Sequence, residues 1–296
     1  MYFSDHTTVF FNGKWQQAEH ANVGLYGQTL HYGIGAIEGM RSYETPLGPQ
    51  IFKAKEHYER LLYSCKALNI PCNYRVDELV ALSYELLDKN NLKNAYIRPL
   101  IYAGPNMGLQ AATEANIFIA AWDWGPYLGS RLLRVVSSTF ERPNPRSSVV
   151  DAKISGYYTN SIMAVNEAKA KGYDEALLND MNGFVAEGPG ANFFYEKDGV
   201  LYTCPKGHIY PGITRSTVME LAKDLDIPVI EKHFMAKDVE GADGAFFTGT
   251  AAEVVGLKSL NDVPFNKEWR QTHGHVLRHA YKSLVRTAEA HVIDVV

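Results

Sequence analysis

The chain has 296 residues, of which 46% are hydrophobic and 21% charged, and its formal net charge at pH 7 is -4. The length suits two ordinary domains, and the composition excludes disordered, collagenous and membrane-embedded proteins. Because the net charge is mild and Lys and Arg are scattered, we expect no nucleic-acid partner.

Neither a run of 18 apolar residues nor a basic start followed by an apolar stretch occurs, so we expect no membrane association and a cytoplasmic location. The three cysteines, Cys65, Cys72 and Cys204, lack metal-ligand spacing, and the histidines show none beside carboxylates. We therefore expect reduced thiols and no metal site.

The first 122 residues predict strands and two helices. Asn12-Gly13 marks a tight turn between strands 8–11 and 14–17. A helix is indicated by an apolar stripe of Tyr58, Leu61, Leu62, Cys65 and Leu68. The other elements expected here are strands 36–43 and 50–53, a helix over 77–90, and strands 95–102 and 116–122.

The stretch DWGPYLGSR has two glycines, a proline and no periodicity, which is typical of a linker. Beyond it we expect a strand over 132–138, a helix over 158–171, strands 175–179, 184–187, 191–196 and 245–248, a helix after Pro211-Gly212, and a final helix over 268–291.

Strands and helices alternate without a regular βαβ cadence, so we predict an α+β protein with mixed or antiparallel sheets. Its expected parts are a small N-terminal domain of residues 1–122, a linker of residues 123–133 and a larger C-terminal domain of residues 134–296.

Familiar signatures of other enzymes are missing from the sequence, namely GxGxxG, GxxxxGK[ST], HExxH and GxSxG. What remains is a series of polar clusters at segment ends. In chain order they are HYGIGAIEGMR at 31–41, ERL at 59–61, YIRPL at 96–100, DAKISGYY at 151–158, EGPGANFF at 187–194, YPGITR at 210–215 and TGTAAE at 248–253.

Some of these clusters indicate chemistry by themselves. Lys153, at the mouth of a predicted helix, is placed as an amine nucleophile. The helix start in PGITR presents the Ile213 N–H and Thr214 to an anion, and Arg60 offers a two-pronged partner for a phosphate. Taken singly, each residue could equally be a solvated lysine, an ordinary helix cap or a surface arginine.

Together the seven motifs resemble those of the fold-type IV pyridoxal-phosphate enzymes, and their spellings are most similar to the branched-chain-amino-acid aminotransferases. The resemblance runs from about Phe10 to Val255. It implies a two-domain fold like that of D-amino-acid aminotransferase, an active site at the domain interface, pyridoxal 5′-phosphate as the cofactor, and a homodimer.

The resemblance also implies which residues bind the cofactor. Lys153 would carry it as a Schiff base and shuttle the proton of the substrate Cα. Glu187 would face the pyridine nitrogen, and Tyr158 the phenolate oxygen. The phosphate would be bound by Arg60, Ile213, Thr214 and Thr250, with Tyr210 near the cofactor ring.

A second set of residues is implied to bind the substrate. The amides of Thr250 and Ala251, helped by Tyr96, would hold the α-carboxylate. Arg98 and Tyr32 would catch the distal carboxylate of glutamate, although Arg98 could instead form a structural ion pair. The side-chain pocket is assigned to Ile37, Gly39, Tyr127 and the loop Met107, Gly108 and Leu109, which would come from the neighbouring subunit.

The expected reaction is a two-step ping-pong transfer of an amino group from leucine, isoleucine or valine to 2-oxoglutarate, giving branched 2-oxo acids and L-glutamate. A D-amino-acid aminotransferase, an R-selective amine transaminase and an aminodeoxychorismate lyase share the fold and stay open. YIRPL and NMGL favour the branched-chain interpretation. A non-catalytic ligand-binding protein is disfavoured by the joint presence of Lys153, Glu187 and Arg60.

Overall fold

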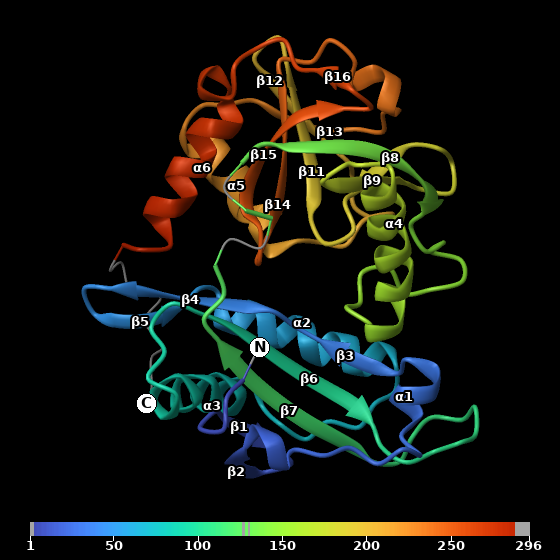
Figure 1. The fold of residues 1–296 in the computed structure, drawn as a ribbon, viewed down its shortest axis with the longest axis vertical. Coiled ribbons are helices and arrows are strands. Elements are labelled where there is room, and N and C mark those ends of the chain that lie inside the picture. Colours follow the sequence, from blue (N-terminus) through green and yellow to red (C-terminus); the bar gives the residue numbers. More distant parts are fainter. Residues whose placement is uncertain (1–2, 126–127, 130, 288–296) are drawn as a thin grey trace. The chain divides into compact units, whose positions relative to one another are not determined.

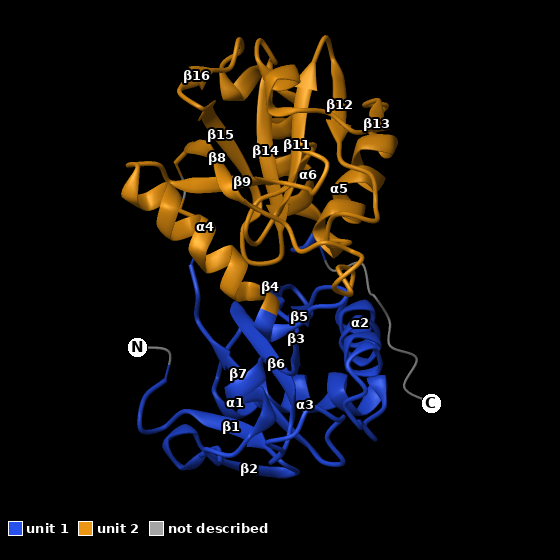
Figure 2. Cartoon of the chain, turned by 90° about the vertical axis from the view of Figure 1, so that its right-hand side faces the viewer, with its two compact units in different colours: residues 1–125, 152–156, 285–296 blue, residues 126–151, 157–284 orange. Residues whose placement is uncertain are grey.

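The computed structural model describes residues 3–125, 128–129 and 131–287. The chain divides into two compact units, with residues 1–125, 152–156 and 285–296 in unit 1 and residues 126–151 and 157–284 in unit 2 (Figure 2).

The division splits the expected linker after Gly125, and it differs from the expected domains in two further segments. Residues 152–156 belong to unit 1 because backbone hydrogen bonds join the Ile37 N–H to the Lys153 carbonyl and the Gly156 N–H to the Gly33 carbonyl. Residues 285–296 are also assigned to unit 1, where the Arg286 guanidinium lies over the ring of Tyr43. Lys153 therefore belongs, by its backbone contacts, to the N-terminal unit.

Unit 1 is built on an antiparallel sheet with strand order β2-β1-β7-β6-β4-β5, in which β3 also pairs with β6 (Figure 1). Its strands are β1 (Thr8–Phe11), β2 (Lys14–Gln17), β3 (Gly35–Ile37), β4 (Met40–Thr45), β5 (Gly48–Ile51), β6 (Ala95–Ala103) and β7 (Ala115–Trp122). The expected turn between β1 and β2 is confirmed, since Asn12 and Gly13 both have positive φ, at 47° and 81°.

Three α-helices accompany this sheet: α1 (Gln28–Tyr32), α2 (Ala54–Ala67) and α3 (Val76–Lys89), together with a short 3-10 helix (Ala18–His20). The helices expected around Tyr58 and over 77–90 are confirmed. Tyr58 and Leu61 of α2 and Leu79 and Leu86 of α3 are fully buried and share one core with strand residues such as Ile97. This core fixes α2, the helix that carries Arg60.

The strand expected over 36–43 is wrong in its continuity, because Glu38 and Gly39 interrupt it between β3 and β4. The Glu38 side chain is fully buried, and the Gly39 N–H donates to its Oε2 at 3.1 Å. A buried carboxylate thus takes a backbone donor at this position, and the strand breaks around it.

Unit 2 contains a mixed sheet with strand order β10-β9-β8-β15-β14-β11-β12-β13. Because β10 pairs with both β9 and β11, six of these strands close into a ring. The strands are β8 (Leu133–Glu141), β9 (Glu175–Asn179), β10 (Val185–Glu187), β11 (Asn192–Lys197), β12 (Val200–Thr203), β13 (Val229–Glu231), β14 (Gly244–Gly249), β15 (Glu253–Leu260) and β16 (Val263–Pro264).

The α-helices of unit 2 are α4 (Tyr158–Ala170), α5 (Ile213–Asp224) and α6 (His273–Leu284), and the remaining 3-10 helices of the chain are Ser155–Tyr157, Ala236–Val239 and Trp269–Gln271. The long final helix expected over 268–291 is wrong in extent. Thr272 is extended and its hydroxyl accepts the His275 N–H at 3.3 Å, so α6 starts only after this residue. Residues 288–291 lie outside the described part of the chain.

The expected fold class, α+β with antiparallel and mixed sheets, is confirmed by the two units. All three cysteines are free. In the described ranges, the structure contains no helix with both the length and the apolar character needed to cross a bilayer.

Candidate active site

Lys153 is held at the backbone by two elements of unit 1. Its carbonyl accepts the N–H of Ile37 at the end of β3, at 3.0 Å. Its own N–H donates to the Ser64 hydroxyl at 2.9 Å, and that hydroxyl donates to the Arg60 carbonyl at 2.9 Å. The amine-bearing residue is thereby tied to the helix turn that carries Arg60.

Arg60 is gripped by the buried carboxylate of Glu38. Its Nε donates to Oε1 at 2.6 Å and its Nη2 to Oε2 at 2.9 Å, which is the two-pronged geometry of a strong charge-assisted pair. His57, also buried, has its Nδ1 2.9 Å from Oε2 of the same carboxylate. Neither Glu38 nor His57 was predicted from the sequence as a neighbour of Arg60.

The charges in this cluster follow from its surroundings. Burial alone would raise the pKa of Glu38, but the Arg60 charge and the hydrogen bonds from His57 and Arg60 outweigh it and hold the pKa well below its usual range. Burial lowers the pKa of His57 despite the neighbouring carboxylate. Glu38 and Arg60 are therefore charged at neutral pH, and His57 is neutral.

Tyr96 and Arg98, both expected on the substrate side, lie two positions apart on β6. Arg98 Nη2 donates to the Tyr96 hydroxyl at 2.8 Å, and Arg98 Nε is buried with no hydrogen-bond partner in the described residues. The same hydroxyl closes over Gly39, where a Cβ would lie 2.0 Å from it. Trp124 packs edge-on against the Tyr96 ring, with 4.7 Å between ring centroids.

The loop of Met107, Gly108 and Leu109 is attached to α1 within unit 1. The Tyr32 hydroxyl donates to the Met107 carbonyl at 3.2 Å, and Gln28 Nε2 donates to the Gly108 carbonyl at 3.0 Å. The side chains of Tyr32, Met107 and Leu109 are exposed, and that of Leu109 is 89% exposed.

Glu187 lies at the end of β10 in unit 2, buried and surrounded by donors. Asn192 Nδ2 donates to its Oε2 at 2.8 Å, and the Tyr210 N–H lies 3.1 Å from Oε1. Arg142 forms an ion pair with it, with Nε 2.8 Å from Oε1, although the Nε–H is not aligned for a hydrogen bond. The carboxylate therefore has a buried cation, Arg142, beside it.

Asn192 connects Glu187 to the start of α5. Its Nδ2 also donates to the Tyr210 carbonyl at 2.8 Å, and a Cβ on Gly212 would lie 2.1 Å from its Oδ1. Gly212 is the N-cap of α5, so the amides of Ile213 and Thr214 stand at the helix N-terminus, where anions bind.

The remaining expected residues of unit 2 lie at element ends. Tyr158 is the first residue of α4, and Thr250 and Ala251 form the turn between β14 and β15. Tyr127, expected in the substrate pocket, lies outside the described residues.

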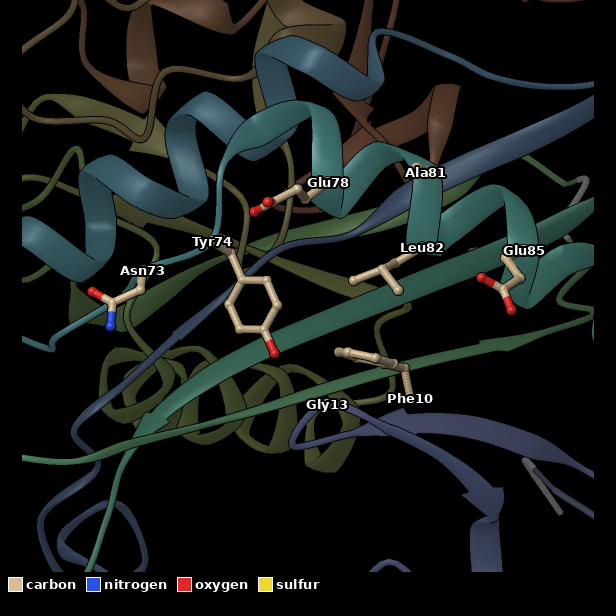
Figure 3. A pocket seen from close by; sticks show the side chains of 8 residues that line it. All are labelled: Phe10, Gly13, Asn73, Tyr74, Glu78, Ala81, Leu82 and Glu85. Carbon is tan, nitrogen blue, oxygen red and sulfur yellow. The ribbon is translucent and has the colours of Figure 1, made fainter.

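A hollow elsewhere in unit 1 has no link to these residues. Figure 3 shows it between α3 and the start of the sheet, with Phe10, Tyr74 and Leu82 pointing into it. Its lining is Phe10, Gly13, Asn73, Tyr74, Glu78, Ala81, Leu82 and Glu85, none of which belongs to the expected site.

Comparison with known proteins decides the family. Residues 35–260 match the model of the family described as amino-transferase class IV. A branched-chain-amino-acid aminotransferase of Pseudomonas aeruginosa is 39% identical over 290 residues, which cover 96% of this chain and 94% of the relative. The chain belongs to the class IV aminotransferases.

Solved structures agree with this assignment. The branched-chain aminotransferase of the archaeon Thermoproteus uzoniensis, solved with norvaline, has a TM-score of 0.90 at 35% identity and covers 94% of each chain. A second branched-chain amino acid aminotransferase (T.th.), complexed with N-(5′-phosphopyridoxyl)-L-glutamate, has a TM-score of 0.90 at 35% identity, over 95% of this chain and 94% of that one.

The expected enzyme class, fold type and cofactor, pyridoxal 5′-phosphate, are thereby confirmed for this class IV aminotransferase. The residues present fit that cofactor chemically. An aldehyde would need an amine, which Lys153 has; a phosphate would need donors, which Arg60 and the α5 N-terminus have; and a pyridine nitrogen would need an anion, which Glu187 has.

The structure connects the residues of each unit. In unit 1 it ties Lys153 to Arg60 and Tyr96 to Arg98; in unit 2 it ties Glu187 to Tyr210 and, through Asn192, to the α5 N-terminus. Glu38 and Asn192 stand inside quoted motifs, IEGMR and EGPGAN, and were missed because a motif names residues without their contacts. Arg142 gave no sequence signal.

Proposed function

We propose that this class IV aminotransferase transfers amino groups from leucine, isoleucine and valine to 2-oxoglutarate by a ping-pong reaction. The observation that carries the proposal is the backbone clamp on Lys153, which ties this amine-bearing residue to the helix turn of Arg60, the arginine that we assign to the phosphate. The Pseudomonas relative is named for branched-chain substrates, and the two solved relatives contain norvaline and a phosphopyridoxyl-glutamate. Norvaline is an aliphatic amino acid, and the glutamate part of the second compound is the amino acid that 2-oxoglutarate yields.

The proposed cofactor roles follow the contacts. Bound pyridoxal phosphate supplies an electron-withdrawing ring that stabilises a carbanion at the substrate Cα. Lys153 tethers the cofactor and then, as a general base, takes the proton from Cα. Glu187, fixed by Asn192, Tyr210 and Arg142, accepts the hydrogen bond of the ring nitrogen.

The remaining cofactor contacts are proposed for five residues and one backbone amide. Tyr158 donates to the phenolate oxygen, and Tyr210 lies beside the ring. Arg60, Thr214 and Thr250, together with the Ile213 N–H, bind the phosphate, for which the donors of a helix N-terminus are suited.

On the substrate side, we assign the α-carboxylate to Tyr96 and the amides of Thr250 and Ala251. Arg98 is proposed to bind the distal carboxylate of glutamate, with Tyr32 beside it, because its buried Nε lacks a partner in the described residues. The apolar side-chain pocket is assigned to Ile37, Gly39, Met107, Gly108, Leu109 and Tyr127.

A homodimer is supported by an exposed apolar surface of unit 1, which we call the α1 patch. It comprises Val23, Leu25, Tyr26, Leu30 and Leu109. The Asn106 N–H donates to the Tyr26 carbonyl at 3.1 Å, which joins the two segments of the patch. Large apolar patches on soluble proteins mark interaction sites, and we assign this one to a second copy of the chain, whose Met107–Leu109 loop then lines the partner's substrate pocket.

The proposal is tested by Lys153→Ala in an assay with L-leucine and 2-oxoglutarate. We expect L-glutamate production to fall by about a thousandfold or more, because the variant lacks both the tether and the base. Lys171→Ala, which removes an exposed lysine paired with Glu167, is the matched control and keeps wild-type activity. Unchanged activity of Lys153→Ala would refute the assigned chemistry.

A further inference from the structure

The Glu38 carboxylate accepts an unusually complete set of hydrogen bonds for a buried acid. Two come from the Nε and Nη2 of Arg60, one from the Gly39 N–H and one from His57. A carboxylate can only accept, so the His57 Nδ1 that faces it at 2.9 Å must carry the proton. Glu38 is thus fixed by two side chains of α2, Arg60 and the neutral His57, and by the adjacent backbone N–H of Gly39.

This cluster decides where the Arg60 guanidinium points. An unrestrained arginine side chain samples many rotamers, and its planar guanidinium binds a phosphate well only when its plane is oriented toward that phosphate. Because the Nε and Nη2 edge of the Arg60 guanidinium is bound to Glu38, the plane of the guanidinium and the direction of its other N–H donors are fixed. The side chain of Arg60 is only 12% exposed, so this grip is little screened by water.

We propose that Glu38 is a positioning residue that presets Arg60 for the cofactor phosphate, and that His57 holds Glu38 in place. The inference rests on the proposed function, in which Arg60 binds that phosphate. It adds that tight cofactor binding depends partly on Glu38, which acts through Arg60 and not by contact with the phosphate.

The test compares two aldehydes that differ only in the phosphate, pyridoxal 5′-phosphate and pyridoxal. Their dissociation constants are measured by absorption titration of apoenzyme. Glu38→Gln keeps the shape of the side chain but removes its charge and sets an amide N–H against the donors of Arg60. We expect its affinity for pyridoxal 5′-phosphate to fall at least tenfold and its affinity for pyridoxal to stay within twofold of wild type.

The matched control is Glu44→Gln. Glu44 is an exposed glutamate of β4 that pairs with Lys93, and we expect its substitution to leave both affinities unchanged. If Glu38→Gln does not fold, Glu38→Asp is used instead. It keeps the buried charge, but its carboxylate is too short to reach both Nε and Nη2, so the same selective loss is expected. Equal losses for both aldehydes, or no loss, would overturn the inference.

Arg60→Ala separates this inference from the proposed function. If wild type binds both aldehydes equally well, Arg60 does not bind the phosphate and the proposed function fails at that residue. If Arg60→Ala abolishes the preference for the phosphate while the Glu38 variants retain it, the proposed function stands and the positioning role fails. The inference also predicts that Glu38→Gln causes no further selective loss in an Arg60→Ala background.

Discussion

Gly39 lies against the side chain of Tyr96, which we propose binds the substrate α-carboxylate. A Cβ at this position would lie 2.0 Å from the Tyr96 hydroxyl, which accepts a hydrogen bond from Arg98. We expect Gly39→Ala to displace both side chains, lower the free energy of unfolding by about 1–3 kcal/mol, and raise KM for leucine and 2-oxoglutarate. Steady-state kinetics and urea unfolding measure these effects.

The control for this substitution is Gly24→Ala, where an added Cβ meets no atom within 4 Å. It should change neither KM nor stability by a comparable amount. Wild-type KM values for Gly39→Ala would show that the Tyr96 position is irrelevant to substrate binding.

Arg142 is the buried cation beside Glu187, with side chains 9% and 5% exposed. Arg142→Met leaves the carboxylate buried without its counter-charge, so we expect the free energy of unfolding to fall by about 3–5 kcal/mol. Arg134→Met removes the exposed pair with Asp262 and should cost less than about 1 kcal/mol. Equal losses in chemical denaturation would contradict a special role for the buried pair.

The residues of this site were unequally visible in the sequence. Lys153, Glu187 and Arg60 stood in motifs whose spelling indicates their chemistry. The residues that hold them in place could not be recognised from the sequence. Arg142 is 45 positions from Glu187 in the chain. Glu38 and Arg60 are 22 positions apart and come together only when α2 packs on the sheet. Pairings of this kind depend on tertiary contacts that a single sequence does not display.

At the scale of elements, apolar periodicity predicted α2 and α3 well because one face of each helix is buried in the core. The break between β3 and β4 was missed because AIEGM fits a strand by composition, whereas the buried Glu38 takes a backbone donor there. The late start of α6 was missed because capping by Thr272 competes with helix propensity.

Helix α4 is anchored to β8 through Glu167, which supports a pH prediction. Hydrogen bonds, first from Lys171 and then from Ser138, lower the pKa of Glu167 from 4.5 to about 2. A carboxylate with a lowered folded-state pKa stabilises the fold above its ordinary pKa, and this stabilisation is lost as the pH falls from about 4.5 to about 2.

We therefore expect Glu167→Gln to be less stable than wild type at pH 6, with a difference in unfolding free energy that shrinks as the pH falls through this window. Urea denaturation at about pH 6, 4 and 3 measures it. A difference that stays constant across these values would contradict the assigned anchor.

At the scale of the whole molecule, activity is expected to depend on a second copy of the chain. Leu25 and Leu109 of the α1 patch are 74% and 89% exposed, and burying such side chains is worth about 1.5–3 kcal/mol each. The double substitution Leu25→Asp with Leu109→Asp should halve the mass measured by light scattering and reduce transaminase activity.

Leu47→Asp is the matched control, because Leu47 is also exposed but lies in the β4–β5 turn away from the α1 patch. It should leave mass and activity unchanged. A double variant that keeps the wild-type mass would place the subunit contact elsewhere.

One absorption experiment tests whether this chain is, as we propose, a pyridoxal-phosphate enzyme that acts on branched-chain L-amino acids. The visible spectrum of purified protein with pyridoxal 5′-phosphate is recorded before and after addition of L-leucine. We predict a band of protein-bound cofactor, absent in Lys153→Ala, that gives way to the pyridoxamine form when leucine is added. A band that leucine leaves unchanged would contradict the branched-chain assignment, and the absence of any band would contradict the role of Lys153.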